Sequence, residues 1–363
     1  MYQSFSTHSH TSSVRTVAAS GKLVASGGAD DRICLFDLEK RREFDNLVEV
    51  HDGTVNCLTF VPDGSYLITG GSDGKMTFIK TSNWKIDKVF ERAHKGSAVN
   101  YISVHPSGKL ALSIGGDLTL RTWNLINGRQ AFATSLKNKS LGSIIDFVVW
   151  STTGDYFAIT GKDSVEVWST RQAEVVATKK CEARPTALCW ISDSDVLVGM
   201  ENGKMLFFNW EDESDEVTLC EIYDSRIKSM KYIDGFLATC SSSGELNLWK
   251  IIVNEKVEME MIGGIDVGCR LICLDIVDLA KAGIECEIKD EEVEEEKKTQ
   301  VRQLKTSGTV TVEIDEDEPE VVTSTPVNKK RKNLQQKTPT STQKKKPKRQ
   351  SLRLTNGFVE EDC

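Results

Sequence analysis

His94, Ser113 and Asp117 are the residue types of a serine hydrolase. In such an enzyme the imidazole takes the proton of the serine, and the carboxylate orients the imidazole. This chemistry also requires an exposed serine and donors for the oxyanion, and the sequence signals neither. The sequence therefore favours a structural role for the three side chains over acyl transfer.

Related sets of side chains occur earlier in the chain, each with part of the pattern lost. A catalytic set would be kept once, whereas a set that recurs with losses fits a scaffold. The related sets are His10, Ser26 and Asp30, and His51, Thr69 and Asp73.

The elements that must position these side chains belong to an internal repeat. A strand, a turn of small polar residues and a second strand recur at residues 23–38, 66–81, 110–125 and 236–251, which is the signature of a hairpin. A large apolar residue in each second strand recurs at steps of 43, 44, 45, 40 and 41 residues. This period is typical of a four-stranded propeller blade, and no segment between these residues has a sustained helical pattern. The repeating residues are Phe36, Ile79, Trp123, Trp168, Phe208 and Trp249.

Such a period predicts an all-β, WD-repeat β-propeller. In a WD repeat, His94, Ser113, Asp117 and Trp123 occupy the four places of a buried hydrogen-bonded chain. Buried polar groups are tolerated only when each has a partner, so the network is expected to fix the geometry of the blade. We therefore expect a protein that is not an enzyme and that binds macromolecules.

Signals for a cofactor or a metal are weak. The glycines at residues 72–75 and 107–109 lie in hairpin turns, and no phosphate-binding loop pattern occurs. Cys269 and Cys273 lack the partners of a tetrahedral metal site. We expect no metal, no cofactor and no small-molecule substrate, and we interpret the other cysteines as small buried residues in a reducing compartment. Typical examples are Cys57, Cys189 and Cys240, together with Cys273.

The net charge of -8 conceals a strongly divided C-terminal segment. Residues 1–280 are assigned to the propeller, and residues 281–363 to a disordered tail, because Phe358 is the only aromatic residue after Trp249. Fourteen acidic residues lie between 285 and 320, and eleven basic residues lie between 321 and 359. No apolar run of about eighteen residues and no secretory signal occurs, so no membrane association is expected.

Two dense basic clusters in the tail are candidates for a nuclear address read by an import receptor. They could also contact nucleic-acid phosphates, or act only as a solvated charge run. Base stacking is not indicated, because no aromatic residues are interleaved. The cluster residues are Lys329, Lys330, Arg331, Lys332, Lys344, Lys345, Lys346, Lys348 and Arg349.

The phrase Val-His-Pro-Ser-Gly-Lys-Leu-Ala-Leu-Ser at residues 104–113 continues to Leu-Arg-Thr-Trp-Asn-Leu at residues 120–125. Together they closely resemble the PAK-interacting WD-repeat family of animals, which includes a yeast counterpart in ribosome assembly. The likeness extends more loosely from Phe5 to Asp278. Tyr223 departs from the pattern, since it stands where a blade histidine is expected, and this predicts one lost hydrogen bond partner.

The resemblance implies a nucleolar scaffold for processing and assembly of the large ribosomal subunit, with pre-ribosomal proteins and pre-rRNA as partners. The alternative that it implies is a negative regulator of PAK-type protein kinases, acting as a signalling adaptor. Either role uses the surface of the propeller and needs no catalytic residue. The implied location is the nucleus and the nucleolus.

The repeat spacing and the resemblance also bear on the number of blades. One period beyond Trp249 falls in the acidic block near Asp290, which cannot form a buried strand. We therefore expect a seven-bladed ring whose seventh blade is incomplete at the N-terminus, built from residues 269–276 and 1–5. The alternatives are a ring closed with six blades and a gap filled by residues 251–262.

Overall fold

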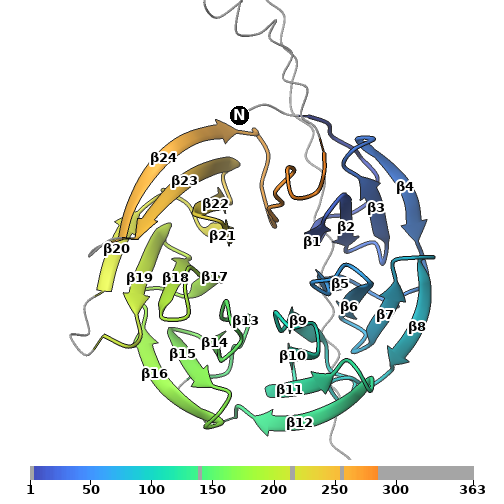
Figure 1. Cartoon of the computed structure of the whole chain (residues 1–363), viewed down its shortest axis with the longest axis horizontal. Coiled ribbons are helices and arrows are strands. Elements are labelled where there is room, and N and C mark those ends of the chain that lie inside the picture. The colour runs from blue at the N-terminus through green and yellow to red at the C-terminus, as the bar shows by residue number, and fades with distance from the viewer. Residues whose placement is uncertain (1–3, 138–140, 213–216, 254–256, 285–363) are drawn as a thin grey trace, which may run out of the picture. The chain divides into compact units, whose positions relative to one another are not determined.

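The computed structural model describes residues 4–137, 141–212, 217–253 and 257–284. Its strands form six four-stranded antiparallel sheets around a central opening (Figure 1). Within each sheet the strands are consecutive in the chain, and the first strand lies nearest the opening (Figure 1).

The twelve strands of the first three sheets are short, and each sheet uses four of them. The strands are β1 (Val14–Ser20), β2 (Leu23–Gly28), β3 (Ile33–Asp37), β4 (Arg42–Leu47), β5 (Val55–Phe60), β6 (Tyr66–Gly71), β7 (Met76–Lys80), β8 (Lys85–Phe90), β9 (Val99–Val104), β10 (Leu110–Gly115), β11 (Thr119–Asn124) and β12 (Arg129–Ser135).

The last three sheets repeat this order and end in the longest hairpin. Their strands are β13 (Val148–Trp150), β14 (Tyr156–Thr160), β15 (Ser164–Ser169), β16 (Glu174–Lys180), β17 (Pro185–Trp190), β18 (Asp195–Met200), β19 (Lys204–Asn209), β20 (Val217–Glu221), β21 (Ile227–Ile233), β22 (Phe236–Ser241), β23 (Glu245–Val253) and β24 (Val257–Asp266).

The large apolar residue that marks the repeat lies in the third strand of every sheet. Trp123 is 2% exposed in β11, and Phe208 is fully buried in β19. Each of these residues occupies the equivalent position of its hairpin. The spacing of 40 to 45 residues in the sequence is therefore the number of residues from one sheet to the next. The all-β propeller predicted from this spacing is confirmed.

Apolar side chains from neighbouring sheets pack together between the blades. Five clusters lie at the five contacts between consecutive sheets, from the first to the sixth. In one of them Leu35 of β3 is packed with Leu58 of β5. Strands buried on both faces read as continuous apolar runs, as β18 does with Val-Leu-Val. The core is therefore a series of layers between blades.

The prediction of a seven-bladed ring with an incomplete seventh blade is wrong, because the structure has six blades. Residues 269–276 form no strand. Residues 1–3 lie outside the described residues, and Ser4 and Phe5 are not in a strand. Ile251 and Ile262 belong to β23 and β24 of the sixth sheet, so they do not fill a gap either.

The physical reason is that residues 269–276 find no strand with which to pair. The segment lies between the sixth sheet and the first (Figure 1), and it makes a single hydrogen bond to each of them. Oδ2 of Asp275 accepts a hydrogen bond of 2.8 Å from the main-chain N–H of Ala19 in β1. The carbonyl of Leu274 accepts one of 3.3 Å from the hydroxyl of Ser229 in β21. The segment ties the first and last blades together without extending either sheet.

The predicted tail and both of its basic clusters lie outside the described residues, apart from residues 281–284. The boundary at residue 280 and the nuclear-address residues therefore stay predictions. Over the ranges that the structure does describe, no helix has the length and apolarity to cross a membrane.

Candidate functional site

The four predicted side chains of the third blade form one hydrogen-bonded chain. Nδ1 of His94 lies 2.9 Å from Oδ1 of Asp117, and Nε2 of His94 lies 2.7 Å from Oγ of Ser113. The indole Nε1 of Trp123 donates to the same Oγ over 2.8 Å. The second and third strands of the blade, the turn between them and the loop before the first strand are thereby joined.

The direction of the hydrogen bonds in this network follows from the two groups at its ends, the indole of Trp123 and the carboxylate of Asp117. An indole N–H only donates and a carboxylate only accepts, so Trp123 donates to Ser113, Ser113 to His94, and His94 to Asp117. The imidazole is then neutral, with its proton on Nδ1. Burial lowers the pKa of His94 below its ordinary value and outweighs the opposing effect of Asp117, which agrees with a neutral ring.

Acyl transfer does not fit this arrangement. His94 and Ser113 are both fully buried, so no substrate reaches the hydroxyl. The hydroxyl oxygen already accepts the proton of Trp123, and its own proton is used on His94. A nucleophile needs an exposed oxygen and an adjacent oxyanion site. The geometry instead suits a network that holds the blade together.

A glycine directly behind each histidine explains why the ring can lie so close to the strand. A Cβ at Gly115 would overlap the ring of His94, and one at Gly71 would overlap that of His51. The same close approach occurs between Gly28 and His10. These glycines end the second strand of the first three sheets, and any side chain there would push the histidine out of the network.

The first two blades keep the network without an indole. Nε2 of His51 lies 2.8 Å from the hydroxyl of Thr69, and Nε2 of His10 lies 2.7 Å from that of Ser26. Ile79 and Phe36 occupy the tryptophan position and have no donor. The aspartates complete both sets, with Nδ1 of His51 3.2 Å from Asp73 and Nδ1 of His10 2.9 Å from Asp30.

In the sixth blade a tyrosine replaces the histidine and keeps the contact. The phenolic oxygen of Tyr223 lies 2.7 Å from the hydroxyl of Thr239, which also accepts the indole N–H of Trp249 at 3.0 Å. The sequence predicted that this blade would lose one hydrogen bond partner. That prediction is wrong, because Tyr223 makes the contact. The longer phenol side chain reaches the hydroxyl at the equivalent position of the second strand, from the equivalent loop before the sheet.

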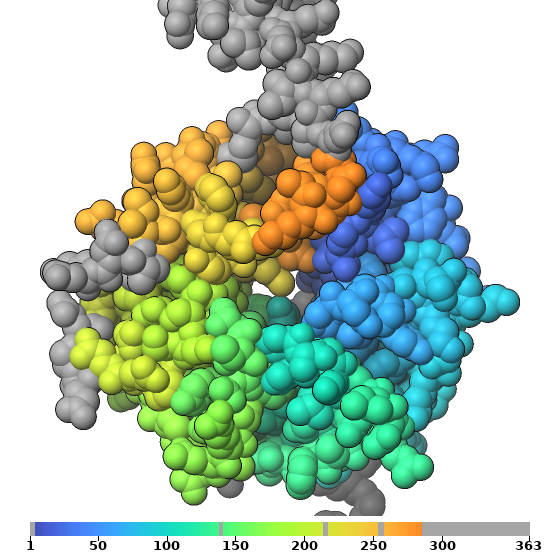
Figure 2. Space-filling model, viewed as in Figure 1, coloured from blue at the N-terminus to red at the C-terminus, as the bar shows by residue number. Residues whose placement is uncertain are grey.

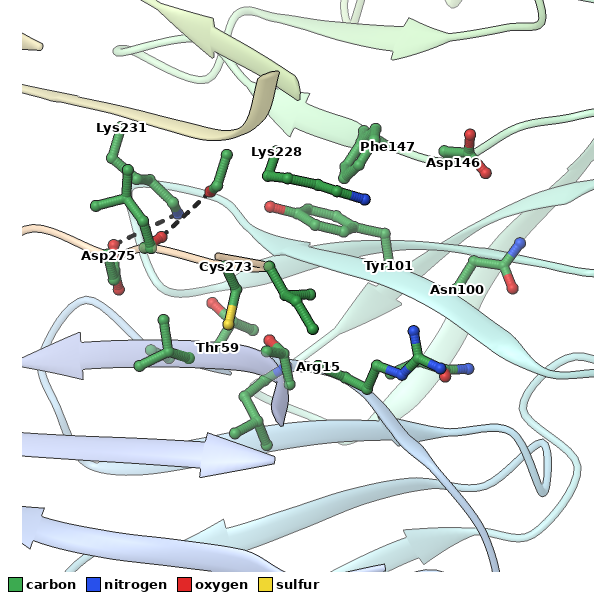
Figure 3. A pocket seen from close by; sticks show the side chains of 18 of the residues that line it. Arg15, Thr59, Asn100, Tyr101, Asp146, Phe147, Lys228, Lys231, Cys273 and Asp275 are labelled. Atoms are coloured by element: carbon green, nitrogen blue, oxygen red, sulfur yellow. Dashed lines mark hydrogen bonds and ion pairs between the residues drawn. The ribbon is translucent and has the colours of Figure 1, made fainter. Parts of the chain in front are cut away.

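A cavity of about 840 Å³ opens at the centre of the ring, where the space-filling view is hollowed (Figure 2). Five of the six first strands have an irregularity near their start, where the pairing register passes over one residue. Every residue that is passed over lines the cavity, and Figure 3 labels three of them, Arg15, Asn100 and Lys228. These residues are Arg15, Asn56, Asn100, Thr186 and Lys228.

The sequence did not lead us to predict this set of five cavity-lining residues. A signal for it exists, since each of these polar residues follows an apolar one at the start of a first strand and recurs with the repeat. The signal is weak because one polar residue in a short strand is ordinary in a half-buried sheet. Only the ring brings the five side chains around one opening.

The basic residues of the cavity come from three adjacent blades. They belong to the fifth, sixth and first sheets or immediately precede their first strands, and they are Arg15, Arg184, Arg226, Lys228 and Lys231. Three of them have carboxylate partners. Arg184 lies 2.5 Å from Asp146, Lys231 lies 3.6 Å from Asp275, and Arg226 is paired with Glu201.

The eight cysteines that the structure describes are all free. Cys57, Cys189 and Cys240 are buried as predicted, whereas Cys273 is half-buried and Cys269 is exposed. Within the described ranges no group of three or more His, Cys, Asp and Glu side chains is placed to hold a metal ion.

The ring of four-stranded sheets and the repeated histidine network define a WD-repeat β-propeller, a class of scaffolds for protein–protein interaction that is typically not enzymatic. The family model described as WD domain, G-beta repeat matches residues 2–37, 44–78 and 84–124.

Similar proteins narrow the class to one family. The chain is 36% identical over 276 residues to a p21-activated protein kinase-interacting protein 1-like protein of Danio rerio, covering 74% of this chain and 72% of that protein. It is 25% identical over 318 residues to Protein MAK11 of Saccharomyces cerevisiae, covering 76% and 74%. It is 25% identical over 271 residues to Shk1 kinase-binding protein 15 of Schizosaccharomyces pombe, covering 73% and 75%. The chain belongs to the p21-activated protein kinase-interacting protein 1 family.

Proposed function

We propose that the chain is a non-catalytic scaffold in the assembly of the large ribosomal subunit, which binds pre-ribosomal proteins through the surface of its propeller. The observation that carries this proposal is the similarity to Protein MAK11, which covers about three quarters of both chains. The family resemblance of residues 104–113 implies the same role. A buried network that fixes the blades suits a rigid scaffold.

Depletion of the protein tests this role. We expect less large-subunit rRNA and an accumulation of its precursors, with small-subunit rRNA as the internal reference. Rescue with the wild-type chain should restore processing, and rescue with Ser113→Ala should restore it only to the extent that the variant folds. Normal levels of large-subunit rRNA and its precursors after depletion would overturn the proposal.

A second function is favoured by the names of two relatives, one of a vertebrate and one of fission yeast, both named for binding a kinase. In this role the propeller occupies the regulatory segment of a PAK-type kinase and restrains it, which requires a surface and no catalytic residue. The full chain should then retain a purified regulatory fragment of such a kinase in a pull-down, and should not retain the isolated kinase domain. Equal recovery of both fragments, or of neither, would remove this candidate.

We further propose that the protein acts in the nucleus and nucleolus and that the basic clusters at residues 329–332 and 344–349 are its import address. Their sequence supports this, since dense Lys and Arg clusters are read by import receptors. Replacement of both clusters by alanine should move a tagged chain to the cytoplasm. Unchanged nuclear accumulation would place the address elsewhere.

A further inference from the structure

Two basic side chains at the central cavity have no anionic partner in the part of the chain that the structure describes. Arg15 lies in β1 and Lys228 in β21, on either side of the segment that joins the sixth blade to the first (Figure 3). Within residues 4–137, 141–212, 217–253 and 257–284, neither side chain has a hydrogen bond or an ion pair.

The electrostatics of Lys228 show that these cations act on one another. Burial lowers the pKa of Lys228 below that of a free lysine, and the positive charges of Arg226, Arg270 and Arg15 lower it further. Like charges gathered in this way make the site favourable for an anion.

We propose that this mouth of the central cavity binds a short acidic segment of a partner protein, whose carboxylates lie between Arg15 and Lys228. This inference goes beyond the proposed function, because it does not depend on which assembly the partner belongs to. A cavity of about 840 Å³ is within the range of small-ligand sites, so a stretch of only a few residues would enter it.

The first strands of the second and third sheets, which also line the cavity, favour a peptide over a polyphosphate. Nδ2 of Asn56 donates to the carbonyl of Val99 at 3.0 Å, and Nδ2 of Asn100 donates to that of Ile145 at 3.3 Å. Each bond uses one of the two N–H groups of its amide, and among the residues described neither amide oxygen accepts a hydrogen bond. The carboxylate of Asp146 also lines the cavity, where it is paired with Arg184.

A ligand that fills the whole mouth can donate hydrogen bonds to the asparagine oxygens and place negative charge beside Arg15 and Lys228. A peptide does both, since its main-chain N–H groups can donate to the asparagine oxygens while its carboxylates face the cations. A phosphate chain has only acceptors and therefore offers no donor to the asparagine oxygens. The charge pattern thus selects an acidic peptide.

The test uses the full chain with the basic clusters at residues 329–332 and 344–349 replaced by alanine, so that the tail does not bind the probe. The probe is fluorescein-labelled hexaglutamate, and binding is measured by fluorescence anisotropy at low salt. In this background we compare R15Q, K228Q and the double variant with the control double variant K85Q/R129Q. The control changes the same charge at exposed residues of β8 and β12.

Loss of one charge-assisted hydrogen bond should weaken binding about tenfold, and loss of both about a hundredfold. The control should bind within about twofold of the parent, and labelled hexaglutamine should not bind. The charge-keeping variants R15K and K228R should retain most of the affinity. Because neither cation has a partner, thermal unfolding of R15Q and K228Q should match that of the parent.

Three results would overturn the proposal: no binding of hexaglutamate by the parent, equal affinity of the cavity and control double variants, or loss of binding only in a variant that has unfolded. Hexauridylate and inositol hexakisphosphate serve as competing probes. If either binds more tightly than hexaglutamate and loses its affinity in R15Q/K228Q, the site belongs to RNA or to a polyphosphate and the peptide assignment fails.

Discussion

The indole Nε1 of Trp123 donates a hydrogen bond of 2.8 Å to Oγ of Ser113, ten residues earlier in the chain. This bond joins the second and third strands of the third sheet by their side chains, in addition to their main-chain pairing. Ser113 also forms a hydrogen bond with His94. One hydroxyl therefore connects the second strand of the sheet, the loop before the sheet and the tryptophan of the third strand.

Removal of that hydroxyl should be costly. In Ser113→Ala the indole N–H of Trp123 and Nε2 of His94 are left buried without a partner, which costs about 1–3 kcal/mol of unfolding free energy. Equilibrium unfolding in urea measures this loss. Ser82→Ala changes an exposed serine between β7 and β8 and should shift the free energy by less than about 0.5 kcal/mol. Equal effects of the two variants would show that the network contributes nothing to stability.

Acid should weaken the first blade through Asp30. Burial alone would raise the pKa of this carboxyl, but hydrogen bonds from His10 and from the amide of Thr11 outweigh it and lower the pKa to about 2. Because the folded value lies below the ordinary value of 3.8, the carboxylate stabilises the fold above about pH 4, and this contribution is lost as the pH falls toward about 2. The difference corresponds to about 2 kcal/mol.

Acid titration of stability, followed by circular dichroism, measures the contribution of Asp30. We expect Asp30→Asn to be less stable than the wild type at neutral pH and to lose less stability between about pH 4 and pH 2. Asp31→Asn alters the exposed neighbouring residue and should keep the acid dependence of the wild type. The same slope in Asp30→Asn and the wild type would contradict the assignment.

Asp275 should matter for closure of the ring. It accepts the N–H of Ala19 at 2.8 Å and pairs with Lys231, whose pKa it raises. Asp275→Ala should lower the free energy of unfolding by about 1–2 kcal/mol and expose residues 267–284 to protease. Asp224→Ala, at an exposed residue, is the matched control. Unchanged protease resistance of Asp275→Ala would show that the segment is kept in place by other contacts.

The thiols should differ sharply in reactivity. Burial raises the pKa of Cys189 to about 12 and also raises that of Cys57, so few thiolates form at either site near neutral pH. Cys269 is exposed. Iodoacetamide followed by mass spectrometry should therefore modify Cys269 in the native chain, and Cys57 and Cys189 only after unfolding. Modification of Cys57 at the rate of Cys269 would mean that the blade opens locally.

Local patterns in the sequence determined the hairpins, the repeat and the members of the histidine network. Strand alternation and turn residues act over a few positions, so the strand around Trp123 could be placed without knowledge of the rest of the chain. The same holds for His94, Ser113 and Asp117, whose types recur at fixed places in the repeat.

Tertiary structure alone decided the number of blades, the contact of Tyr223 and the cavity. Residues 269–276 resemble a strand in sequence, yet a strand exists only where main-chain groups pair in a ladder, and this segment makes only single hydrogen bonds to β1 and β21 among the described residues. Arg15 and Lys228 are at opposite ends of the propeller sequence and meet at one opening because the ring brings the first and sixth sheets together. Their repulsion arises from that long-range closure, which no local pattern encodes.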